Sequence, residues 1–520
     1  MYINTAQVDN VMDIHLILKA VEDYQLAMAN ETYPYLVGQK KAVATAKITK
    51  KYAKIFTPAA IKLVQKSYEE ATGDVKRQRK LLLHYLVQLC LEQKVAKLND
   101  AMDNYGAKAS IVVDKKKVPY LNVHGLLQNT TSHGKRSFIV ERTMPIKKKL
   151  ALLAKKRHDL INTTIKHLGL GSYYSFFSEY KDHDLLSLCE ELRGFLLATE
   201  KAYLPLLEEH LHQIHVELKD AEQHDIAYIM RATAFDKFFH KDKLVSTLKK
   251  TLLAMGYDLG KQDNILLDAE DRPTKQPRAF CFPFVIPDDI RFVVKPAGGP
   301  GDYDTILHEA GHAEQMVHID KNLPYVYKML GDYTLSEGFA YLFEYLIMDE
   351  DWLHYYVHMD KKTFYKFERF QLFQKMMFIR RYAAKLLYEI KLHSGDYRKL
   401  GRNFKSCNGT YKNISEMYAT ILGNATHVKY EEVNALLDLD DGFYTADYCT
   451  AWLIQAQLEE HLCKNYGMTW FLNPKVKSFL NAMYACGNQY DAGTLIKRFL
   501  GEGLDSAALK KEFEHLLRNA

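Results

Sequence analysis

Apolar residues in the N-terminal half recur every three or four positions, and this periodicity constrains the fold more than any other feature of the chain. It is clearest in AAIKLVQKSYEEA (59–71) and KRQRKLLLHYLVQLCLEQKVAKL (76–98). This spacing lines up apolar side chains along one face of an α-helix. From the start of the chain to about residue 260 we expect one helix after another. A small hairpin or loop at ASIVVDKKKVPYLNVHG (109–125) interrupts them.

The amino-acid composition of the chain changes near Asp271. The segment DRPTKQPRAFCFPFVIPDDIRFVVKPAGGPGD holds five of the 13 prolines before Gly298, and it includes one β-rich run, Ile290 to Val294. After the GGPG turn the helical periodicity resumes and continues to the C-terminus. The pattern predicts an all-α, mainly helical protein with one small β-sheet.

No internal repeat or low-complexity linker divides the 520 residues. The change near Asp271 separates an N-terminal helical portion, 1–270, from a second portion, 271–520. Because nothing resembling a flexible linker joins them, we expect the two portions to form one integrated unit.

Charge, cysteine usage and hydropathy exclude several functional classes. The net charge of +6 is scattered, and basic runs such as KKKLALLAKKRH (147–158) fit solvated helix faces, so we expect no nucleic-acid partner. No window approaches 18 uncharged apolar residues, and the first residues lack the pattern of a signal peptide, so we expect no membrane segment. Seven dispersed cysteines, an odd number, favour reduced thiols and a cytoplasmic location. The oligomeric state has no signal in the sequence.

The stretch LHEAGHAEQMVH (307–318) carries the strongest chemical motif. On a helix His308 and His312 project from one face and can share one metal ion, and Glu309 is rotated by about 100° and can hold a water without ligating the metal. Two neutral nitrogens, an open position and a carboxylate base are what a zinc hydrolase needs. His318 is a poor third ligand, because on a continuous helix it lies about 15 Å from His308 along the axis.

A better third ligand lies 25 residues beyond His312, in GDYTLSEGFAYLFEYLIMDEDWL (331–353). Glu337, Tyr341 and Glu344 form a narrow stripe opposite the apolar face of this predicted helix. The spacing allows a turn and an antiparallel return helix, so Glu337 can complete a His-His-Glu site for one zinc ion. Glu344 is then the natural partner that orients a ligand. A stripe that simply faces water is the competing interpretation.

HEAGH followed by Glu337 resembles the zinc oligopeptidase family of thimet oligopeptidase, neurolysin and oligoendopeptidase F, and more distantly angiotensin-converting enzyme. The resemblance implies one zinc per chain on His308, His312 and Glu337, with Glu309 as the general base. It also implies a two-lobed, largely helical fold around a deep channel, with the small sheet next to the active site.

Two further segments extend the resemblance. PRAFCFPF and the following IRFVVKPAGGPGD resemble the edge strand on which such enzymes hold an extended peptide, which implies substrate contacts at Arg291, Phe292 and Val293. DGFYTADYCTAWLIQAQLEEHL (441–462) matches the segment whose tyrosines donate to the oxyanion; Tyr448 fits best and Tyr444 lies one turn before it. The histidine and the carboxylate-gripping lysine that relatives carry near this point have no counterpart in NALLDLDDGF.

These observations predict a zinc metallopeptidase that hydrolyses internal bonds of short unstructured peptides. Residues 1–270 would supply a lobe and channel wall, and 271–520 the zinc-binding catalytic portion. Two alternatives stay open: a zinc carboxypeptidase that trims C-termini, with Arg291 or Lys295 gripping the carboxylate, and a non-catalytic helical peptide-binding protein. An intact Glu309 argues against the binder, which has no need of a base.

Overall fold

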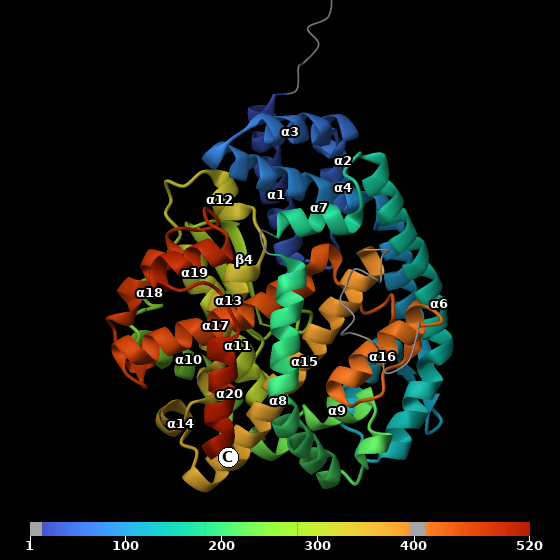
Figure 1. The fold of residues 1–520 in the computed structure, drawn as a ribbon, viewed down its shortest axis with the longest axis vertical. Helices are drawn as coiled ribbons and strands as arrows, with labels where there is room; N and C mark the ends of the chain where they lie inside the picture. Colours follow the sequence, from blue (N-terminus) through green and yellow to red (C-terminus); the bar gives the residue numbers. More distant parts are fainter. Residues whose placement is uncertain (1–12, 182–183, 278, 395–410, 520) are drawn as a thin grey trace, which may run out of the picture.

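Helices form most of the described chain, as the periodicity predicts (Figure 1). The structure is a computed structural model that describes residues 13–181, 184–277, 279–394 and 411–519. The helices are α1 (Ile14–Leu36), α2 (Thr45–Lys51), α3 (Pro58–Glu70), α4 (Gly73–Lys108), α5 (Val123–Gln128), α6 (His133–His167), α7 (Tyr173–Tyr180), α8 (Leu185–Gln213), α9 (Gln223–Ile229), α10 (Leu244–Ala254), α11 (Pro300–Val317), α12 (Tyr325–Met329), α13 (Thr334–Glu344), α14 (Glu350–Trp352), α15 (Lys361–Ser394), α16 (Ile414–Thr426), α17 (Tyr444–Tyr466), α18 (Val476–Tyr484), α19 (Ala492–Leu500) and α20 (Ala507–Asn519). The prediction of a mainly helical fold is confirmed.

Two small sheets complete the described structure. The strands β1 (Ser110–Val113) and β2 (Lys116–Pro119) pair as an antiparallel hairpin inside the predicted interruption at 109–125. The second sheet contains β3 (Ile265–Asp268), β4 (Phe280–Val285) and β5 (Asp289–Val293) in the order β3-β5-β4. The small sheet predicted in this part of the chain is therefore present.

The position of β5 corrects one prediction. It pairs in parallel with β3, where Ile265 faces Ile290, and antiparallel with β4, where Phe280 faces Val293. A strand with neighbours on both sides has its backbone groups engaged in two ladders. The prediction that Ile290–Val294 is an edge strand open to a substrate is therefore wrong, and β4 is an edge strand instead.

The central position of β5 determines the surroundings of the three side chains proposed for substrate contact. Phe292 and Val293 are both 0% exposed and belong to the core. Arg291 lies 2.6 Å from Asp289 through Nε, and its guanidinium is stacked over the ring of Phe284 at 5.2 Å. Two of the three residues are packing residues, and the third is bound within the sheet.

Helix α13 packs directly between α11 and α17 because two glycines remove the side chains that would separate them. A Cβ on Gly311 of α11 would lie 2.6 Å from the Ala340 Cα, and one on Gly338 of α13 would lie 2.7 Å from the Ile454 Cγ2 of α17. Real Cβ contacts are never this short, so the helix backbones approach more closely than alanine permits. The three helices that carry the predicted site thus form one layer of the core.

The main hydrophobic core contains residues from both sides of the change in composition near Asp271. It runs from Ile17 in α1 to Phe513 in α20 and includes residues of the β3-β5-β4 sheet. Within the part of the chain that the structure describes, no helix combines the length and apolar character needed to cross a membrane.

Candidate metal centre

His308 and His312 lie one turn apart on α11 and point to the same place. Their Nε2 atoms are 3.1 Å apart. The helix begins with Pro300 in its first turn after Gly299, and the Asp302 carboxylate accepts a hydrogen bond from the Gly298 N–H at 2.6 Å. Proline and an acidic residue both favour a helix N-terminus. The GGPG turn therefore sets the start of the helix that carries both histidines.

Glu337 joins the histidines from the neighbouring helix α13. Its Oε2 lies 3.3 Å from the Nε2 of His308 and 3.9 Å from the Nε2 of His312. The residue is 4% exposed, and its Oε2 accepts no hydrogen bond within the described part of the chain. A buried carboxylate oxygen without a hydrogen bond is costly unless a cation occupies the point it faces. The donor set and its convergence fit a zinc ion, and the three residues are those predicted from the spacing.

The other nitrogen of each imidazole has its own partner. His308 Nδ1 lies 2.7 Å from the Glu344 Oε2, and His312 Nδ1 lies 2.7 Å from the Ser336 Oγ. These contacts fix the rings so that both Nε2 atoms face Glu337, as outer partners of metal-ligating histidines do. Burial lowers the pKa of His312 to about 4, which keeps that imidazole neutral. The placement of Glu344 agrees with its predicted role, whereas Ser336 was not anticipated.

Glu309 follows His308 on α11, and its carboxylate is hydrogen-bonded to the sheet. Its Oε2 accepts a hydrogen bond of 2.7 Å from the Cys281 N–H of β4. Burial raises the pKa of its carboxyl to about 7, although the charge of His308 opposes the shift. It lines a hollow of about 680 Å³ together with residues of β4 and with Lys295. Glu309 therefore has the setting of a base facing open space rather than that of a ligand.

The two tyrosines of α17 lie on the other side of Glu337. The Tyr444 hydroxyl donates to the Glu337 Oε1 at 2.6 Å, and the Tyr448 ring is 4.7 Å from the Tyr444 ring between centroids. Burial raises the pKa of both phenols, and the Glu337 carboxylate adds to the effect, so both are protonated donors at neutral pH. In this geometry Tyr444 holds Glu337, the candidate third ligand, while Tyr448 lies one turn further along the same helix.

The turn before Tyr444 is set by a residue that the sequence did not single out. Gly442 and Phe443 both have left-handed backbone conformations, with φ of 64° and 55°. The Gly442 N–H donates to the Tyr173 hydroxyl of α7 at 2.5 Å. Non-glycine residues adopt this conformation at a cost that the surroundings must offset. No local pattern links Tyr173 to a turn 269 positions away.

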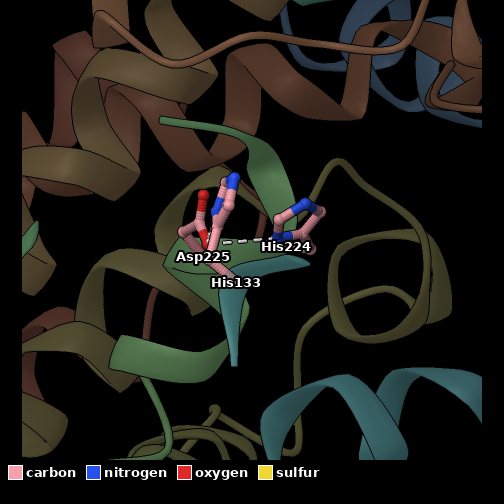
Figure 2. A group of neighbouring side chains, drawn as sticks. All are labelled: His133, His224 and Asp225. Carbon is pink, nitrogen blue, oxygen red and sulfur yellow. Dashed lines mark hydrogen bonds and ion pairs between the residues drawn. The ribbon is translucent and has the colours of Figure 1, made fainter. Parts of the chain in front are cut away.

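A second histidine cluster, formed by His133, His224 and Asp225, lies far from α11 in sequence, on α6 and α9 (Figure 2). Its nitrogens His133 Nδ1 and His224 Nδ1 lie 2.9 and 3.1 Å from the Asp225 Oδ1. The same oxygen accepts a hydrogen bond of 2.6 Å from the buried guanidinium of Arg136. Because this cation already neutralises the carboxylate, a metal ion there would meet a fixed positive charge. The cluster is an ion-pair network joining α6 to α9.

No protein-family model matches the chain, and no curated protein matches it. Function is therefore inferred from the motif residues and their geometry.

Proposed function

We propose that this protein is a zinc-dependent peptidase that cleaves internal bonds of short, unstructured peptides. One observation carries the proposal: His308, His312 and Glu337 converge from two helices, and a separate carboxylate, Glu309, lies beside them. Two histidines, one carboxylate and a nearby base match the needs of metal-assisted peptide hydrolysis.

Zinc, when bound by these three side chains, supplies Lewis-acid polarisation of the scissile carbonyl and of a water molecule. The protein's own groups do the rest. Glu309 accepts the proton of the attacking water and passes it to the leaving amine. Tyr448 donates to the oxygen that becomes negative as the carbonyl is attacked. Glu344 and Ser336 keep the imidazole rings in place throughout.

The substrate lies along β4. This strand is an edge of its sheet, and its Cys281 N–H points at Glu309, so it borders the site directly. An extended peptide can add to an edge strand through backbone hydrogen bonds, which select length and extension more than sequence. A folded protein presents no free extended segment of this kind. Peptides of roughly 5 to 20 residues are the expected substrates.

A carboxypeptidase is the second candidate, and one observation favours it. Lys295 lines the same hollow as Glu309, where its ammonium could meet a free C-terminal carboxylate. That ammonium already donates to the Arg272 carbonyl oxygen at 3.0 Å. The engaged lysine makes the endopeptidase the stronger proposal.

Digestion of a peptide library by the purified protein, read by mass spectrometry, tests the proposal. Glu309→Gln is the matched control, because it is nearly isosteric and should retain zinc while losing almost all turnover. Equal cleavage by both proteins would show that the base, and with it the mechanism, is misassigned. Binding without cleavage by the wild type would favour the peptide-binding protein.

Amidated and free-acid versions of the same peptides separate the two peptidase modes. An endopeptidase should cleave both at similar rates. Loss of residues one or two at a time from free-acid peptides only, abolished in Lys295→Met, would instead establish the carboxypeptidase.

A further inference from the structure

A second hollow, of about 420 Å³, lies at the other end of β4 from Glu309. Ser336 forms part of its lining, and the Ser336 Oγ is 2.7 Å from the Nδ1 of the metal-binding His312. Tyr333 also lines it, and its ring lies 5.4 Å from the ring of Tyr444. Two independent contacts therefore connect the hollow to the metal centre.

The walls of this hollow are mainly apolar, aromatic or thioether groups. They come from α1, α4, β4, α11 and α12, and include Met28, Ala29, Tyr85, Phe284, Met316 and Met329. Methionine and aromatic side chains adapt to large apolar ligands. The charged groups in the lining are Glu92, Lys328 and Asp332, two acids and one base, and the Lys328 ammonium donates to the Lys321 carbonyl oxygen at 3.1 Å.

The hollow that contains Glu309 has a different character. Its lining is evenly mixed, because Gln276, Lys295, Asp302 and Thr305 lie beside apolar residues such as Phe280 and Val294. Phe282 of β4 contributes to both hollows, which places them next to each other along the strand. A peptide extended along β4 therefore meets a mainly apolar hollow near Ser336 and a hollow of mixed polarity near Glu309.

We propose that the 420 Å³ hollow is a specificity pocket that binds one bulky apolar side chain, of the size of leucine, methionine or phenylalanine, at a fixed position relative to the cleaved bond. This inference rests on the proposed peptidase function and adds the class of peptide that it prefers. Its volume and apolar lining are those of a typical small-ligand pocket. Transfer of a large apolar side chain from water into such a pocket favours the peptide over its alanine analogue by about 10- to 100-fold in kcat/KM.

Peptides that differ at one position, carrying Ala, Leu, Phe, Lys or Asp there, test the pocket. Wild-type protein should cut the Leu and Phe peptides at least about 10-fold faster than the Ala peptide. Ala29→Phe fills the hollow from α1 and should remove that preference while the Ala peptide is still cut. Ala27→Phe is the matched control, because it adds the same side chain to α1 outside the lining, and it should keep the wild-type preference.

A second variant distinguishes a change of substrate preference from a loss of folding. Met28→Glu places a carboxylate in the lining and should raise the rate on the Lys peptide relative to the Leu peptide by about 10-fold or more. An unchanged ranking in both Ala29→Phe and Met28→Glu, or a wild-type preference for Lys, would overturn the pocket assignment while leaving the peptidase proposal intact. A wild-type protein that cuts none of the peptides would count against the peptidase proposal itself.

Discussion

Glu337 is the residue on which the proposed metal site depends most, because it is the proposed ligand that comes from a different helix. Purified protein should contain about one zinc ion per chain, since two imidazoles and one carboxylate form a single open site. Glu337→Ala should lose that zinc, measured by elemental analysis after dialysis. The matched control is His318→Ala: His318 caps the end of α11, and its Nδ1 lies 2.8 Å from the Glu314 carbonyl oxygen. Zinc retained by Glu337→Ala but lost from His318→Ala would reverse the assignment.

Tyr444 and Tyr448 should differ in what their removal costs. Tyr448→Phe should retain zinc and lose on the order of 100-fold in kcat, the usual effect of removing one oxyanion donor. Tyr444→Phe removes the hydrogen bond to the Glu337 Oε1 and should weaken zinc binding by about 10- to 100-fold, as loss of a ligand's outer partner does. Zinc titration with a competing chelator and steady-state kinetics separate the two effects. A Tyr448→Phe enzyme with normal kcat would transfer the donor role to Tyr444.

Site residues that share a helix could be predicted from the sequence. Contacts between residues of different helices could be predicted only in part. His308 and His312 follow from four-residue spacing, and Glu337 and Glu344 from a stripe seven residues apart. Ser336 was missed although it directly precedes Glu337, because serine in a helix has many local uses. The Cys281 contact to Glu309 is made by a backbone N–H, which carries no residue-specific signal.

Among the elements, the crossing of α11 and α13 brings Glu337 close to the two histidines. Gly311→Ala would place a Cβ 2.6 Å from the Ala340 Cα, so the two helices must separate. We expect a loss of about 1–3 kcal/mol in the free energy of unfolding, together with weaker zinc binding. Gly301→Ala is the matched control on the same helix, because nothing lies within 4 Å of its Cβ. Denaturant unfolding of both variants checks this, and equal stability would contradict the close crossing.

The position of β5 within its sheet could not be predicted from sequence periodicity. The β-rich run at Ile290–Val294 was correctly expected to be a strand. An apolar run, however, has the same sequence pattern in a central strand and in an edge strand. What decides its position is the pairing with β3, whose four residues Ile265–Asp268 give a weak signal and lie before the expected boundary. Pairing between segments distant in the sequence is not encoded in either segment alone.

On the scale of the whole molecule, the helix α15 connects both portions of the chain, and it carries a buried carboxyl that couples stability to pH. It packs against α8, α16 and α17 (Figure 1). Glu389, near its end, is 0% exposed, and its Oε1 accepts a hydrogen bond of 3.0 Å from the Asp440 N–H. Burial raises the pKa of this carboxyl to about 8, although the nearby Lys385 opposes the shift.

The sign of the resulting pH dependence follows from proton release. Between the ordinary pKa of 4.5 and about 8, the unfolded chain has lost this proton while the folded chain retains it. The contribution of Glu389 to stability is therefore fully present below pH 4.5 and is lost as the pH rises through about 8.

Glu389→Gln keeps an acceptor for the Asp440 N–H but cannot ionise. The variant should gain a few kcal/mol over the wild type at pH 8 and little at pH 5, measured by urea unfolding across this range. Glu502→Gln, at an exposed position, should follow the wild-type profile. A Glu389→Gln profile parallel to that of the wild type would mean that this carboxyl is already ionised in the folded protein, with Lys385 outweighing its burial.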